Sequence, residues 1–77
     1  MADLVKVHVT FRWLGVSKLQ ERATRQSVYS VLVTAGAVVM RVDVAFMDFA
    51  LSVRDWQKVE DRFKSCLGSR GELEVSR

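Results

Sequence analysis

The chain has few of the residues that mark a secreted scaffold or a membrane protein. It contains one cysteine, Cys66, which excludes an internal disulfide and every multi-thiolate zinc pattern. Its longest apolar runs are short, as at positions 37–40, and fall far below the roughly 18 residues needed to span a bilayer. The first residues show no basic region followed by an apolar stretch, so we expect no signal peptide. Together these features predict a cytoplasmic protein.

Glycine and histidine are also scarce. The four glycines, at positions 15, 36, 68 and 71, each mark the end of an element, so none belongs to a phosphate-cradling loop. His8 is the only histidine, and without a second imidazole or a thiolate at ligand spacing it does not make a typical transition-metal site. We therefore predict neither a metal nor a cofactor.

No catalytic constellation emerges from the remaining reactive residues. Cys66 falls on a helical apolar stripe, where a thiol is usually a small buried side chain, and His8 is expected on the opposite side of the sheet. Asp43 and Asp48 flank a strand junction and fit solvated turn residues better than an acid/base couple. The sequence predicts a non-enzymatic protein. The alternative is a minimal enzyme with an oligomeric site around His8.

The composition fits one small globular domain covering residues 1–77. Hydrophobic residues make up 49% of the chain and charged residues 27%, which argues against disorder. A domain of this size buries only about 60% of its unfolded surface, so few residues are spared for a deep cavity. The basic residues are scattered among the acidic ones, so the net charge of +3 indicates an anionic partner only weakly.

Hydrophobic periodicity defines the first half. Apolar residues alternate with polar ones from Val5 to Trp13, the pattern of a strand with one buried face. Ser17 begins an S-x-x-Q capping sequence, so a helix is expected from there to Gly36. Its apolar stripe is expected to consist of Leu19, Ala23, Val28, Val31, Leu32 and Ala35.

The segment 38–53 alternates twice, with a change of phase. Val38 to Phe46 keeps one parity and Phe49 to Val53 the other, so the phase slips near Met47. A tight reversal gives a hairpin, although the junction lacks the usual Gly or Asn. The alternative is one long, bulged strand shared between two chains. In both cases Phe46 and Phe49 are placed on the core side.

The second half predicts a helix followed by a short strand. Asp55 is the expected helix cap, and the apolar stripe of the helix is Trp56, Val59, Phe63, Cys66 and Leu67. Residues 72–75 alternate as a last strand. The order βαββαβ with right-handed crossovers predicts an α+β fold of the ferredoxin-like type, with an antiparallel sheet, two helices on one face, and the first and third strands central.

The uncovered face of such a sheet is expected to be polar. Its predicted residues are Lys6, His8, Thr10, Arg12, Arg41, Asp43, Ala50, Ser52, Glu72 and Glu74. With no aromatic ring among them and several carboxylates, we do not expect direct nucleic-acid binding. The opposite charges on neighbouring strands fit a self-paired, solvated surface.

The second strand is an edge strand in this topology and indicates association. Val39 and Ala45 lie on its nominally polar side, and an apolar edge without proline or lysine tends to pair with another chain. Burial of both sides of the strand is an equal alternative. Arginine is suited to interfaces. The predicted partner-binding residues are Arg22, Arg25, Val39, Arg41 and Arg70.

The order of elements resembles the ACT regulatory domain. The matching features are Gly15 after the first strand, the helix ending at 29–36 with its Ala-Gly pair, the strands around 38–42 and 49–53, and the Asp-Trp pair at 55–56. In that family small ligands, often amino acids, lie between paired domains near the first strand-to-helix loop. By this resemblance the ligand-binding residues would be Trp13, Leu14, Gly15, Val16 and Ser17.

Two functional classes besides the enzyme follow from these patterns. The favoured one is a non-catalytic adaptor or inhibitor that forms a homodimer and binds a protein partner, including a phage-type inhibitor of a nucleic-acid-bound protein complex. The other is an ACT-like regulatory domain that binds a small ligand such as an amino acid at a dimer interface. A screen for thermal stabilisation by amino acids separates them.

Overall fold

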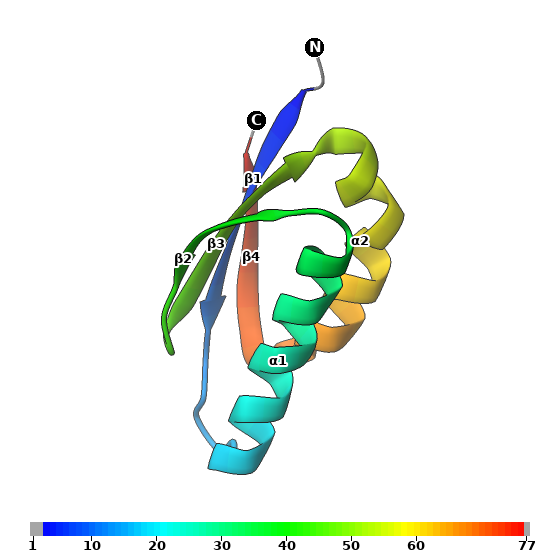
Figure 1. Ribbon diagram of the computed structural model, residues 1–77. Helices are drawn as coiled ribbons and strands as arrows, with labels where there is room; N and C mark the ends of the chain where they lie inside the picture. The colour runs from blue at the N-terminus through cyan, green and yellow to red at the C-terminus, as the bar shows by residue number, and fades with distance from the viewer. Residues whose placement is uncertain (1–2, 77) are drawn as a thin grey trace.

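Four strands, two helices and a 3₁₀ turn make up the computed structural model, which describes residues 3–76 (Figure 1). In chain order they are β1 (Leu4–Phe11), α1 (Lys18–Thr34), β2 (Val38–Val42), β3 (Phe46–Ser52), α2 (Val53–Leu67), η1 (Gly68–Arg70) and β4 (Gly71–Ser76). This is the predicted βαββαβ order. No helix in residues 3–76 has the length and apolarity required to cross a membrane.

The strands form one antiparallel sheet in the order β2-β3-β1-β4. Both helices cover the same face, and the other face is open (Figure 1). β1 and β3 are central, and β2 and β4 are the edges. The prediction of a ferredoxin-like α+β fold is confirmed. It follows from two right-handed crossovers, each of which returns its helix to the same side of the sheet.

The core lies between the helices and the covered face. Its buried apolar side chains are Val5, Val7, Val9, Phe11, Val28, Leu32, Met47, Phe49, Leu51, Trp56, Phe63 and Leu67. Phe49 and Phe63 are fully buried, and the ring of Trp56 packs edge-on to Phe63 with centroids 5.5 Å apart. The alternation in β1 and the predicted stripe of α2 are therefore both confirmed.

Serine side chains cap both helices. The Ser17 hydroxyl accepts a hydrogen bond from the Gln20 amide at 3.2 Å, as its capping sequence predicts. At α2, however, Ser52 is the cap and accepts from the Asp55 amide at 3.1 Å. The prediction that Asp55 caps this helix is wrong. Asp55 lies in the first turn, where its charge favours the positive end of the helix dipole.

The first turns of α1 extend beyond the end of the sheet (Figure 1). Leu19 is 78% exposed and Ala23 is also exposed, so their predicted place in the core stripe is wrong. Thr24 is buried in their stead, next to Arg70, whose guanidinium donates to its hydroxyl at 2.7 Å. Only the later turns of α1, with Val28 and Leu32, lie over the sheet core.

Residues 38–52 form a hairpin, not one exchanged strand. The chain reverses through 43–45, where the Asp43 carboxylate accepts from the Ala45 amide at 3.1 Å and the Asp43 amide donates to the Phe46 carbonyl at 2.8 Å. The aspartate thus does what a glycine or asparagine was expected to do. In addition, the register jumps between Val39 and Arg41, which leaves Met40 as a β-bulge.

These two irregularities place the phase change before Phe46. β3 buries Met47, Phe49 and Leu51, so Phe46 and Ala50 point to the open face. The prediction of Phe46 on the core side is therefore wrong. Because a shift by one residue moves a side chain to the opposite face, the bulge and loop together were enough to invert it.

The start of β4 lies tightly against β1. Gly71 pairs with Phe11, and a Cβ atom at Gly71 would lie 2.7 Å from the Thr10 carbonyl oxygen and 2.9 Å from Leu67 Cδ1. Glycine is required here for close approach and not for its dihedral freedom, since its backbone is extended. At Gly36, by contrast, φ is +91° and the space around it is open.

Candidate functional site: the open sheet face and the β2 edge

A row of polar side chains crosses the open face at one level of the sheet. Arg41 on β2 pairs with Asp48 on β3, Asp48 with His8 on β1, and His8 with Glu74 on β4. The row therefore alternates positive, negative, imidazole and negative groups. Such an arrangement favours cross-strand attraction and gives the open face a mixed charge.

The His8 ring is held by two hydrogen bonds. A carboxylate is only an acceptor, so His8 Nδ1–H donates to Asp48. In the neutral ring Nε2 is then an acceptor, and the Thr10 hydroxyl lies 3.1 Å from it. His8 is half-buried and lies on the polar face, as the sequence predicts. Because Cys66 is on α2, on the other side of the sheet, the two do not form a nucleophile–base pair.

Phe46 places one aromatic ring on this face. The Arg41 guanidinium carbon lies 4.8 Å above the ring centroid, and the His8 ring, inclined by 27° to the Phe46 ring, has its centroid 6.1 Å away. The expectation of an open face without aromatics is therefore wrong. The expected carboxylates Glu72 and Glu74 are nonetheless present in β4, and Asp48 of β3, which was not predicted on this face, adds a third.

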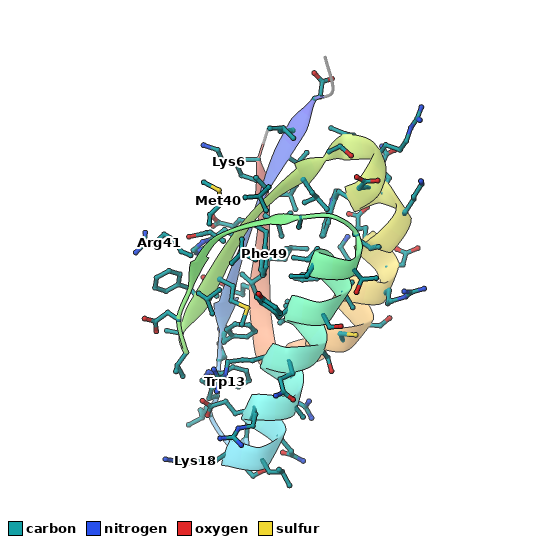
Figure 2. The ribbon with its side chains drawn as sticks, in the orientation of Figure 1. Lys6, Trp13, Lys18, Met40, Arg41 and Phe49 are labelled. Carbon is teal, nitrogen blue, oxygen red and sulfur yellow. The ribbon has the colours of Figure 1, made fainter. Side chains whose placement is uncertain are left out.

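Beside this row the open face is hollowed by a cavity of about 240 Å³. It is lined by Lys6, Val7, Met40, Arg41, Asp48 and Phe49. Lys6, Met40 and Arg41 project from the sheet away from the helices, whereas Phe49 points toward them (Figure 2). The hollow thus has a rim of two cations, a thioether and a carboxylate.

In the predicted ligand loop, residues 13–17, several groups make contacts within the fold. Trp13 stacks on Phe11 with centroids 4.7 Å apart, and its indole N–H donates to the Val44 carbonyl at 2.8 Å. The Val16 amide donates to the Trp13 carbonyl at 3.1 Å, with Gly15 between them at φ +76°. Leu14 is 98% exposed, and Ser17 is occupied as the cap of α1.

The predicted partner-binding arginines occupy different environments. Arg22 is exposed, while Arg25 is half-buried and its Nε is a buried donor without a partner in residues 3–76. Arg70 bonds Thr24 through its side chain, and its carbonyl accepts from the Arg12 amide at 2.7 Å. Arg41 lies over Phe46. The structure therefore distributes these arginines over α1, β2 and η1.

β2 is an edge strand whose exposed side chains are mostly apolar. All five residues of the strand are exposed, with exposed fractions of 61% for Val38, 37% for Val39, 56% for Met40 and 51% for Val42. Within residues 3–76 no strand pairs with this edge. At the other edge, β4 alternates Glu72 and Glu74 with its apolar residues. Charges of this kind discourage strand addition, and β2 has only Arg41.

One flank of α1 contacts Phe49 of β3, which is the strand partner of Val39 in β2. Positions 22, 25, 29 and 33 recur at helical spacing, and the Tyr29 ring contacts Phe49 edge-on at 6.1 Å. Tyr29 and Val33 are 39% and 40% exposed. The opposite flank, with Ala23, Ser27 and Ser30, faces Cys66 of α2.

Two contributors to the open face were not foreseen as site residues. In the sequence Met40 has the same parity as the apolar residues expected in the core. No glycine or proline marks the bulge that turns it outward. Lys6 was placed on the correct face but not next to Met40, because this contact depends on the same bulge.

No protein-family model matches the chain, and no curated protein matches it.

Proposed function

We propose that the protein is a non-catalytic binding domain that forms a homodimer through β2 and binds a protein partner. The observation that carries this proposal is the exposed edge of β2, four of whose five residues are apolar. Such an edge offers unpaired N–H and C=O groups together with apolar side chains, which is the combination used in strand addition.

The occupant of this edge is a second copy of the chain. Antiparallel pairing of β2 with its symmetry mate makes an isologous contact centred near Met40, in which the exposed apolar side chains of both copies meet. The bulge at Met40 then meets the same bulge at the same level.

The flank of α1 extends the contact beyond the strands. A pair of five-residue strands alone covers less than the roughly 800 Å² per partner of a stable interface. Tyr29 and Val33, both partly exposed beside the covered side of β2, add apolar surface there. Arg22 at the exposed end of this stripe provides the positive contact for an acidic protein partner.

The site of action fits a reducing compartment such as the cytoplasm, because the single thiol, Cys66, is half-buried and unpaired. Direct nucleic-acid binding is not part of the proposal. Asp48, Glu72 and Glu74 all belong to the open face, where they repel phosphate.

Solution mass by light scattering tests the dimer. The monomer has a mass of 8.8 kDa, so the dimer is expected at twice that value. Val42→Lys places a desolvated charge in the β2 edge and should return the protein to the monomer mass. Val75→Lys is the matched control, since Val75 is a 42% exposed valine of the opposite edge strand, and it should remain dimeric.

Two results would contradict the proposal. A wild-type protein that stays monomeric at about 100 μM would be too weak a dimer for this role. Dissociation caused by Val75→Lys but not by Val42→Lys would locate the interface at the wrong edge.

A further inference from the structure

The hollow on the open face owes its shape to the bulge in β2. In a regular strand Met40 and Arg41 would point to opposite faces, but the extra residue at Met40 lets both line the same cavity. The side chains of Val7 and Phe49 are fully buried on the covered side, so these residues contribute backbone to the floor. Next to them, Ala50 lies directly opposite Lys6, and its methyl group leaves space between β1 and β2.

The cations on the rim are not neutralised by side chains of residues 3–76. The ion pairs in this part of the chain join His8 with Asp48, Arg12 with Glu72, and Glu60 with Lys64. Lys6 and Arg41 take part in none of them, although both border the cavity. Asp48, the only carboxylate on the rim, already accepts the His8 N–H. The rim therefore carries two unpaired positive charges and one engaged negative charge.

This charge balance selects the ligand. Two cations and one carboxylate leave a net charge of +1, which a monoanion neutralises, whereas a dianion would leave an excess negative charge beside Asp48. A guanidinium holds a carboxylate through two parallel hydrogen bonds, and contact with the Phe46 ring face leaves its N–H groups free to donate. The Met40 thioether supplies a soft, adaptable surface for an apolar group.

The geometry points to a binding site for a small organic carboxylate, held by Lys6 and Arg41 with its apolar stem against Met40. The cavity of about 240 Å³ is smaller than a drug-sized pocket and suits a compact molecule. Met40 and Arg41 also belong to the β2 edge of the proposed dimer, but Val42 is not among the lining residues, so Val42→Lys separates the two proposals by leaving every lining residue in place.

The test is a titration of the ¹⁵N-labelled full chain followed by amide chemical shifts. The probe is phenylacetate, with phenylacetamide as the neutral analogue of the same shape and phenyl phosphate as the dianion. Phenylacetate should cause saturable shifts centred on Lys6, Met40, Arg41 and Asp48, with a dissociation constant in the millimolar range expected for so small a ligand. Phenylacetamide should bind at least about tenfold more weakly.

Matched variants separate this site from general surface charge. Arg41→Ala and Lys6→Ala should each weaken phenylacetate binding by about tenfold, whereas Arg62→Ala and Lys58→Ala, which remove equal charges from exposed positions of α2, should change it by less than about twofold. All four positions are exposed, so the fold is preserved, and the amide spectrum verifies this.

Three results would overturn the inference. The first is the absence of saturable shifts, or their appearance around other residues. The second is equal binding of phenylacetate and phenylacetamide, which would remove the role of charge. The third is tighter binding of phenyl phosphate, which would make the site a phosphate site. Dimerisation is measured separately by solution mass, so failure of one proposal does not affect the other.

Discussion

Replacement of Gly71 by alanine is expected to destabilise the fold through a single methyl group. The new Cβ would lie 2.7 Å from the Thr10 carbonyl oxygen and 2.9 Å from Leu67 Cδ1. The Leu67 methyl belongs to a side chain that can rotate, but the carbonyl belongs to the backbone of β1. That strand is held between β3 and β4 and cannot retreat without disturbing both ladders.

The magnitude follows from the cost of overpacking. Forcing an extra methyl into a tightly packed site costs about 1–3 kcal/mol, and contact with fixed backbone places Gly71→Ala in the upper half of that range. A chain of this length has a total unfolding free energy of roughly 4–12 kcal/mol. The expected loss of about 2–3 kcal/mol therefore lowers the Tm by about 10–20 °C.

Gly36→Ala is the matched control for this measurement. Its φ of +91° makes alanine strained, but no atom lies within 4 Å of the new Cβ, so only the conformational cost of about 1 kcal/mol applies. Urea unfolding followed by circular dichroism compares the variants with the wild type at one protein concentration, because dimerisation raises apparent stability. The reasoning is refuted if Gly71→Ala costs less than Gly36→Ala.

Two further substitutions test the corrected details of the hairpin and of α2. Phe46→Ala, on the open face, should lower the unfolding free energy by about 1 kcal/mol, whereas Phe49→Ala, in the core, should lower it by about 3–5 kcal/mol. Equal losses in urea unfolding would show that Phe46 is a core residue. Ser52→Ala should cost about 1 kcal/mol and speed hydrogen exchange of the Asp55 amide, whereas unchanged exchange would show that Ser52 is not the cap.

The elements that have one covered face could be predicted from the sequence. β1 and α2 each bury one side, so their apolar residues recur with the period of the element, and the strand order follows from crossover handedness. The hairpin was harder, because a bulge at Met40 and a reversal at Asp43 shift the phase without glycine or proline. The apolar alternation of β2 therefore continues through the loop at 43–45, although the chain reverses direction there.

The candidate site depends on those same irregularities. The polar residues of β1 and β4 were assigned to the open face correctly, since their alternation is regular. The hollow was not predictable, because it requires Met40 and Arg41 to share a face. The overhang of α1 explains the misplaced Leu19, because helical periodicity does not report where the sheet beneath a helix ends.

The central position of β1 also has a consequence for the order of folding during synthesis. Of the four strands β1 is made first, yet its two neighbours are β3 and β4, which are the third and fourth to be made. The pairing of Lys6 with Ser76 joins residues from the two ends of the sequence, a contact of high sequence separation that slows folding. Until β4 is made, one edge of β1 has no partner strand. An unpaired strand edge is open to association with other chains, so the completion of β4 closes the most exposed stage of folding.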